Sequence, residues 1–216
     1  MNVQPFSDGA ILKAAWQRVK DRLGFIIILG IVLAVYFIAG SSITGWIASE
    51  SDWGFIVAEL IYIILSMVIG IGMIRIYLDL ADGKDGSLVD LVKHWNLLLK
   101  YIGVSIVYGI VVLVGYLLLV FPGVIWGLKF HFAPWLVIDK GMGPIEAMKV
   151  SSQMTMGMKW DLLGFHVVVS VVMAIGFVLL GVGMIVTMPL GMIATAMLYR
   201  HLSQGAATPA QPASVV

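Results

Sequence analysis

Residues 24–47 read GFIIILGIVLAVYFIAGSSITGWI and contain no charged side chain. A helix of about 20 apolar residues is long enough to cross the hydrocarbon core of a bilayer. Over the whole chain of 216 residues, 61% are hydrophobic and only 12% are charged. A soluble protein of this size cannot bury so much apolar surface. The sequence therefore predicts a polytopic helical membrane protein and argues against a soluble enzyme domain and against a β-barrel, whose hydrophobicity alternates more weakly.

Five more apolar runs follow the first, at residues 54–76, 101–120, 124–138, 162–181 and 184–199. If the N-terminus lies in the cytoplasm and the runs cross alternately, 12 of the 13 Lys and Arg residues fall on the cytoplasmic side. The positive-inside rule favours that orientation. The fourth and sixth runs are short for a span, and the charge distribution is the reason to count them. We therefore predict an all-α fold of six transmembrane helices in a compact bundle, with both termini in the cytoplasm.

Three cytoplasmic segments, at residues 9–23, 87–99 and 144–158, carry apolar side chains at helical spacing on one face. Such helices are typical of elements that lie in the plane of the membrane interface. We expect them to form a cuff on the inner leaflet. Basic side chains near these segments would contact anionic lipid headgroups, each with about 1 kcal/mol of attraction near the surface. The candidate headgroup-binding residues are Arg18, Lys20, Arg22, Lys84, Lys93, Lys100, Lys149 and Lys159.

One order of elements recurs along the chain: an interfacial helix, a span outward and a span back. The junctions at residues 82–87 and 139–144 are both acidic, glycine-rich turns before a helix start, although any short loop before a helix has a similar composition. The tail at residues 204–216 is rich in small and polar residues, so we expect it to be disordered in the cytoplasm. The predicted repeat units are residues 1–80, 81–140 and 141–203, within a single membrane domain of residues 1–203.

Several motifs along nearly the whole chain resemble those of a known family. They are Arg75-x-Tyr77-Leu78-Asp79-Leu80, Phe121-Pro122-Gly123 with Lys129 and Ala133-Pro134 following, Asp139 through Gly143-Pro144-Ile145-Glu146-Ala147, Ser151 through Thr155 with Gly157 and Trp160, and Gly181-Val182-Gly183 before Thr187-x-Pro189. Together they resemble the bacterial inner-membrane proteins grouped with the membrane domain of glycerophosphoryl diester phosphodiesterase. The resemblance implies a location in the bacterial inner (cytoplasmic) membrane. It does not imply the phosphodiesterase activity, which belongs to a separate soluble domain, because only a short tail follows Arg200.

Two charged side chains fall well inside predicted spans, Glu59 in the second and Lys129 in the fourth. At about 1.5 Å per residue, both lie roughly 9–10 Å below the outer boundary of the membrane. Charges at such depth mark functional sites or ion pairs. The two residues are candidates for a transport path. The structural alternatives are an ion pair between two spans, or a lysine that extends toward the interface.

His131 and His166 are also placed within spans. Intramembrane histidines relay protons or bind metals in some proteins, but a single hydrogen bond between helices is the commoner role. Pro122 and Pro134 flank the fourth span, and Pro189 interrupts the sixth. Prolines in this pattern are typical of broken helices at transport sites and equally of bent structural helices.

The motifs of enzymes are missing from this sequence. It contains no cysteine, and no spacing typical of a catalytic triad, a zinc site or a Walker motif. We expect no cofactor, no metal and no nucleic-acid partner. The sequence predicts a non-enzymatic, lipid-interacting membrane protein that organises the bilayer, or that scaffolds or forms a subunit of a membrane complex. Its partners would be lipids, other membrane-protein subunits or further copies of itself. The alternative is a small-solute or lipid transporter that uses the region of Glu59 and Lys129.

Overall fold

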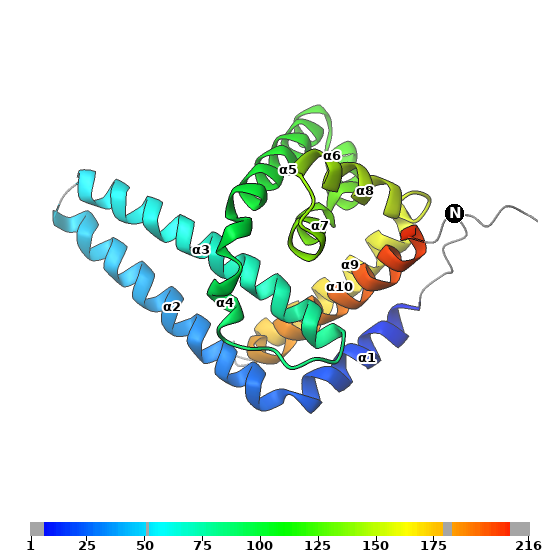
Figure 1. Ribbon diagram of the computed structural model, residues 1–216, viewed down its shortest axis with the longest axis horizontal. Coiled ribbons are helices and arrows are strands. Elements are labelled where there is room, and N and C mark those ends of the chain that lie inside the picture. The colour runs from blue at the N-terminus through cyan, green and yellow to red at the C-terminus, as the bar shows by residue number, and fades with distance from the viewer. Residues whose placement is uncertain (1–6, 51, 179–182, 208–216) are drawn as a thin grey trace, which may run out of the picture.

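The computed structural model describes residues 7–50, 52–178 and 183–207, and the regular structure within these ranges is entirely helical (Figure 1). The predicted all-α class is therefore confirmed. The elements are α1 (Asp8–Asp21), α2 (Leu23–Glu50), α3 (Asp52–Ala81), α4 (Asp90–Lys93), the 3-10 turn η1 (Trp95–Leu97), α5 (Leu98–Leu118), α6 (Val120–Phe130), α7 (Ala133–Lys140), α8 (Pro144–Met154), α9 (Lys159–Val178) and α10 (Met184–Ala207).

Five segments of the described residues are helical, long and apolar enough to cross a membrane. They correspond to the first five predicted spans and support the membrane-protein class. The sixth predicted span lies in α10, which is not among them, since Arg200 and His201 make its C-terminal half more polar. The six-span layout therefore stays a prediction. The five segments are Leu23–Ala48, Asp52–Ala81, Asp90–Leu118, Val120–Lys140 and Lys159–Val178.

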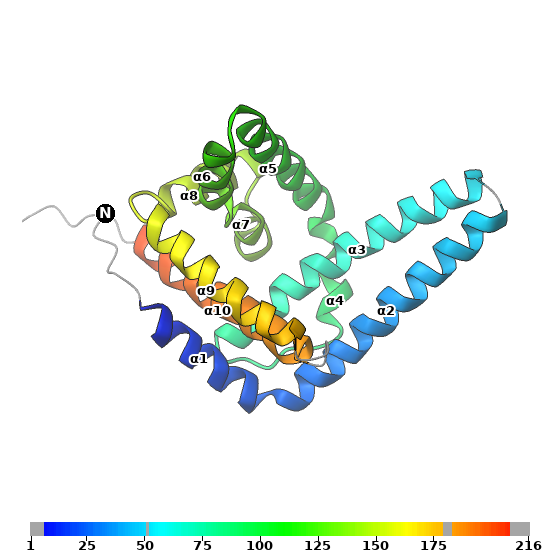
Figure 2. The same cartoon turned by 180° about the vertical axis from the view of Figure 1, so that it is seen from behind.

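Three helical hairpins determine the shape of the molecule: α2 with α3, α5 with α6, and α9 with α10 (Figure 1). The α2–α3 hairpin projects away from the other helices, and the α9–α10 hairpin runs across its direction in both views (Figures 1 and 2). The hairpins thus do not form the compact bundle that we predicted. Lipid tails are as apolar as leucine side chains, so no hydrophobic force draws the outer parts of the hairpins together.

The buried core lies where the C-terminal half of α3 meets α7 and α10, with α1 and α8 packed around them. Tyr77, Phe132 and Tyr199 are among its largest fully buried side chains. The rings of Phe132 and Trp135 each lie 6.0 Å, between centroids, from the ring of Tyr199. Aromatic side chains bury a large apolar area each, and this cluster concentrates the tertiary packing at one end of the α2–α3 hairpin.

The apolar faces of α1 and α8 are partly covered by protein. Ala15 and Val19 of α1 are fully buried, and α1 lies along α10 (Figures 1 and 2). Ala147 and Met148 of α8 are buried where that helix packs on α5 and α7. Other members of the predicted stripes stay exposed, Trp16 on α1 and Ile145 on α8, so the cuff on the inner leaflet stays a prediction. An amphipathic helix buries its stripe equally well against a neighbouring helix.

The predicted helix at residues 87–99 is broken into α4, η1 and the start of α5. The α4 backbone approaches α3 so closely that a Cβ atom on Gly72 would overlap with the main chain of Asp90 and Leu91. The opposite face of the segment remains open, and it keeps the character of an interfacial element. Its large exposed apolar side chains are Val89, Val92, Trp95 and Leu99.

The fourth predicted span is a broken helix, which is one of the two forms that its prolines allowed. Two residues, 131–132, separate α6 from α7, and Pro134 lies in the first turn of α7. The break leaves the Lys129 carbonyl without a helical donor. Its oxygen instead accepts hydrogen bonds from the hydroxyls of Ser151 and Thr155 of the α8 region, at 3.1 Å each. Hydroxyl groups from a neighbouring helix commonly satisfy the backbone at such breaks.

The sixth predicted span is not interrupted, because α10 continues through Pro189. Proline at this position near the start of the helix removes a single ladder hydrogen bond, and Pro122 lies likewise in the first turn of α6. The helix also extends to Ala207, so the predicted disorder is wrong for residues 204–207. The remainder of that tail, residues 208–216, lies outside the described residues.

The tip of the α5–α6 hairpin contacts the start of α9. The ring centroids of Phe121 and Trp160 are 6.2 Å apart. The six-span layout placed Phe121 at an outer turn and Trp160 at a cytoplasmic helix end, which would separate them by about 30 Å of hydrocarbon. Two side chains in contact lie at the same depth in the membrane. Phe121 and Trp160 therefore cannot lie on opposite sides of it, as the six-span layout required.

The contacts between elements follow the predicted repeat units. α4 packs on α3, α8 packs on α7, and α1 packs on α10. Each interfacial segment therefore contacts the return helix of the preceding unit, and α1 closes the series on the last return helix. The division into repeats itself stays a prediction.

Candidate functional site

Three aspartates lie at the C-terminal ends of helices, where electrostatics disfavours them. Asp79 is in the last turn of α3, Asp82 follows that helix, and Asp139 is in the last turn of α7. Their carboxylates face the negative end of the helix dipole and therefore need positive partners. Arg75 and Arg200 supply the positive charge. We call Arg75, Asp79, Asp82, Asp139 and Arg200 the polar clasp.

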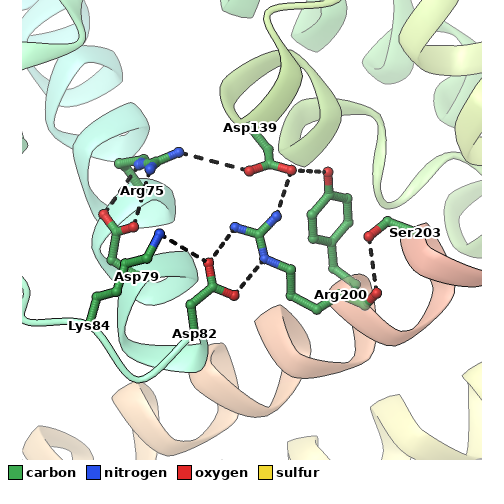
Figure 3. A network of polar contacts seen from close by, with 8 residues as sticks. Arg75, Asp79, Asp82, Lys84, Asp139, Arg200 and Ser203 are labelled. Carbon is green, nitrogen blue, oxygen red and sulfur yellow. Dashed lines mark hydrogen bonds and ion pairs between the residues drawn. The ribbon is translucent and has the colours of Figure 1, made fainter. Parts of the chain in front are cut away.

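Arg200 of α10 is the centre of the polar clasp (Figure 3). Its Nε and Nη2 donate to the two carboxylate oxygens of Asp82 at 2.8 Å each, and its Nη1 donates to Asp139 at 2.7 Å. The planar guanidinium suits such two-sided recognition. Burial lowers the pKa of Arg200, but the hydrogen bonds and charges of Asp82 and Asp139 outweigh burial and raise that pKa above its ordinary value. Arg200 is therefore permanently charged.

Arg75 forms the second half of the clasp from α3. Its Nε and Nη2 donate to the carboxylate of Asp79 at 3.2 Å each, and its Nη1 lies 3.8 Å from Asp139. The hydroxyl of Tyr199 also donates to Asp139, at 2.8 Å. Asp139, whose side chain is only 9% exposed, is thus contacted by three side chains from two other helices.

Charge within the clasp region is balanced. The Nζ of Lys84 lies 3.9 Å from Asp82, so three acidic and three basic side chains face one another (Figure 3). Each of the three carboxylates is engaged by a donor of the same chain. In the described ranges no group of three or more His, Asp or Glu side chains is arranged to hold a metal ion. What this arrangement can do chemically is hold α3, α7 and α10 together.

Glu59 and Lys129 do not form the ion pair considered from the sequence. Glu59 is half-buried near the outer end of α3, whereas Lys129 lies in the last turn of α6 with its Nζ 5.1 Å from the ring centroid of Phe130. Neither takes part in an ion pair within the described ranges. α3 packs chiefly on α2, α4, α5, α7 and α10, while α6 packs on α5, α8 and α9. Equal depth along two helices does not make them neighbours.

The two histidines that were predicted to lie within spans do meet. The ring centroids of His131 and His166 are 4.5 Å apart, with the planes at 82°. The Nδ1 of His166 lies 2.7 Å from the Leu162 carbonyl; a carbonyl only accepts, so this nitrogen carries the proton. The Nε2 of His166 is buried without a hydrogen-bond partner. The pair joins the break between α6 and α7 to α9.

The candidate headgroup-binding residues separate into two groups. Members of the first group lie against their own chain: Arg22 pairs with Asp85, Lys84 with Asp82, Lys100 donates to the Gly141 carbonyl at 2.7 Å, and the Arg18 guanidinium lies beside Gly83. Members of the second group are exposed and form no ion pair within the described ranges: Lys20, Lys93, Lys149 and Lys159. Headgroup binding stays a prediction, and in the second group no carboxylate of the described ranges pairs with the side chain.

Sequence reasoning did not predict the polar clasp. Arg75, Asp79 and Asp139 stood in the motifs that carry the family resemblance, and Arg200 counted only as a cytoplasmic charge. The signal that could have found the clasp is the position of the acidic residues at helix C-termini, where each needs a basic partner. The identity of that partner depends on contacts between residues as far as 118 positions apart.

Comparison with known proteins finds relatives without an assigned activity. The chain is 31% identical over 151 residues to uncharacterised proteins of Mycobacterium bovis and of one strain of Mycobacterium tuberculosis, and 32% identical to an uncharacterised protein of a second M. tuberculosis strain. Each alignment covers 65% of this chain and 44% of the relative, so the chain spans less than half the length of these relatives. No family model and no solved structure matches the chain. The resemblance to the phosphodiesterase-associated membrane domains stays a prediction.

Proposed function

We propose that this chain is a non-enzymatic, lipid-interacting protein of the bacterial inner membrane that organises the surrounding bilayer or scaffolds a membrane complex. Cytoplasmic termini, as the charge distribution predicts, belong to the same proposal, whereas the placement of Phe121 and Trp160 on opposite sides of the membrane does not. The observation that carries it is the division of the surface. Ionic side chains pair with one another at the polar clasp, while large apolar side chains point outward from the hairpins.

The α2–α3 hairpin gives the clearest support. Ile38, Trp46 and Trp53 on this hairpin are 66%, 68% and 79% exposed. Side chains of this kind need lipid or another apolar surface around them, and tryptophans near helix ends are typical of the membrane interface. The exposed apolar face of residues 89–99 would rest on a leaflet in the same way.

The transport alternative stays a prediction with less support. It requires a polar cavity that reaches Glu59 or Lys129. The grooves between the helices of the described ranges are lined by apolar side chains and a few hydroxyls, with His166 and Lys159 as the exceptions, and neither Glu59 nor Lys129 lines them. The broken α6–α7 segment resembles a transport site, but its free carbonyl is already occupied by Ser151 and Thr155.

The test is extraction of the full chain with its own bilayer in polymer nanodiscs, followed by native mass spectrometry and lipid analysis. We expect anionic phospholipids to be enriched over the bulk membrane. A protein retained at fixed stoichiometry would assign the scaffold form of the proposal.

The contrary result comes from proteoliposomes. If the purified chain catalyses saturable flux of a solute, and Lys129→Met abolishes that flux while Lys149→Met leaves it unchanged, the protein is a transporter and our proposal is wrong. Lys149 is the matched control because it is an exposed lysine of α8 that forms no ion pair within the described ranges.

A further inference from the structure

A groove lies between α6 and the first turns of α9. Its volume is about 240 Å³. The α6 wall consists of Phe121, Val124, Ile125 and Leu128, and the α9 wall consists of Lys159, Trp160 and Leu163. The groove is therefore apolar along its length and carries one cationic side chain.

The α9 end of the groove is both aromatic and charged. Trp160 is 70% exposed and contacts Phe121 across the groove, at 6.2 Å between ring centroids. Lys159 is exposed and forms no ion pair within the described ranges. Asp161 lies two positions further along α9 and is not a lining residue; side chains two apart on a helix do not face each other. The ammonium of Lys159 is thus available to an external anion.

The surface beside the groove is suited to a hydrocarbon environment. Residues 117–121, at the tip of the α5–α6 hairpin, are Leu117, Leu118, Leu119, Val120 and Phe121, and each is between 62% and 77% exposed. Five consecutive exposed apolar residues are costly in water. A lipid that enters the groove would therefore come directly from the bilayer around this tip.

We propose that the α6–α9 groove binds one anionic phospholipid, with an acyl chain along the apolar wall and the phosphate at Lys159. This inference rests on the proposed lipid-interacting function and names the lipid class and the site. Charge complementarity decides the occupant. A larger groove of about 400 Å³ between α2 and α3 has no charged lining residue, so it has no group that would select an anionic headgroup. The positive end of the 20-residue α9 adds to the attraction at Lys159.

The experiment is lipid competition on the purified full chain. Native mass spectrometry follows retention of phosphatidylglycerol against phosphatidylcholine of equal chain length. We expect the wild type to retain one phosphatidylglycerol preferentially, and Lys159→Gln to reduce that preference about fivefold, the effect of one interfacial lysine. Lys13→Gln, at an exposed lysine of α1 that does not line the groove and is not a candidate headgroup-binding residue, should keep the full preference.

A second pair of variants tests the apolar wall. Leu163→Trp fills the groove and should remove the retained lipid whatever its headgroup, and Leu163→Phe is the milder variant if the first does not fold. Val171→Trp on the exposed face of α9 is the control, and thermal unfolding in detergent checks each variant.

The outcomes separate the site from the general function. If the wild type shows no preference for anionic lipid in any assay, the proposed lipid-interacting function fails and this inference with it. If the wild type prefers phosphatidylglycerol but Lys159→Gln and folded Leu163 variants bind it as the wild type does, the function stands and the α6–α9 site is wrong.

Discussion

The polar clasp and the outer part of the α2–α3 hairpin show two opposite ways of folding an apolar chain. Around the clasp, Tyr77 and Tyr199 are buried and Arg200 reaches two aspartates at the ends of other helices. On the outer hairpin, α2 and α3 contact each other through the stacked rings of Tyr36 and Tyr62, 5.5 Å apart, while their other faces are open. The same chain is therefore tightly packed around the clasp and exposes most of its apolar side chains on the outer hairpin.

The difference follows from what surrounds each region. In water, burial of apolar surface drives helices together, and charges need partners when they leave water. In lipid, an exposed apolar side chain costs nothing, so packing there depends on close fit and a few hydrogen bonds. The contrast between the regions therefore predicts large effects of mutations at the clasp and small effects on the outer hairpin.

The largest effect is expected from Arg200→Met. The change leaves Asp82 and Asp139 without their main partner, and both side chains are less than a quarter exposed. We expect a loss of about 3 kcal/mol in free energy of unfolding, the lower end for breaking a buried ion pair. Thermal unfolding in detergent is the measurement. Lys140→Met, an exposed lysine without an ion pair in the described ranges, is the control; equal losses for the two variants would show that the clasp does not hold the helices.

A smaller loss, about 2 kcal/mol, is expected from Gly72→Ala, the cost of overpacking. An added Cβ atom would overlap with the backbone of α4, which cannot rotate away as a side chain can. Gly70→Ala is the matched control, because its Cβ would meet only the Tyr101 hydroxyl, at 3.7 Å. Comparable unfolding temperatures for both alanine variants would contradict the close approach of α4 to α3.

Thr155→Val should cost about 1 kcal/mol, because the Lys129 carbonyl keeps its hydrogen bond from Ser151. The double variant Ser151→Ala/Thr155→Val leaves that carbonyl without a donor, and we expect it to cost more than the two single changes together. A chemical-denaturation series on the four proteins measures this. Strict additivity would mean that another group satisfies the break between α6 and α7.

On the outer hairpin, Tyr36→Phe removes the hydrogen bond between the Tyr36 hydroxyl and Ser66 Oγ, which is 2.8 Å long. Hydrogen bonds between membrane helices contribute about 0.6 kcal/mol on average, so the expected loss is small. A loss as large as that of Arg200→Met would remove the contrast between the two regions.

The smallest effect is the coupling between Glu59 and Lys129. Because the two residues form no ion pair, Glu59→Gln and Lys129→Met should add to within about 0.5 kcal/mol in a double-mutant cycle. A coupling well above that value would show that the two side chains meet in the membrane, and it would revive the transport alternative.

Much of the secondary structure could be predicted from the sequence, and little of the tertiary arrangement. The run at residues 24–47 predicted α2, and the prolines around residues 122–134 indicated either a broken or a bent fourth span, of which the structure has the broken form. Both depend only on local properties, apolar length and a missing N–H. The apolar stripe of α1 could also be predicted from the sequence. The surface that covers it could not, because lipid and α10 can both bury the same apolar side chains.

The candidate site shows the same limit. Sequence reasoning selected Glu59 and Lys129 because a charge inside an apolar run is conspicuous, and it passed over Asp82, Asp139 and Arg200 because charges at helix ends are ordinary. Individual charges are visible in a sequence, but their pairing depends on which helix ends converge. His131 and His166 were each visible as polar residues in spans, and only the fold placed their rings 4.5 Å apart.

The sequence by itself determined that this protein is helical and suited to a membrane, because hydrophobicity and helix length are properties of single segments. The tertiary structure alone decided that α3, α7 and α10 are joined by one arginine, that α1 packs on α10, and that the α5–α6 tip meets Trp160. In an apolar solvent the choice among apolar neighbours is set by shape and by a few polar contacts. Neither can be read from one segment, since both exist only when two segments meet.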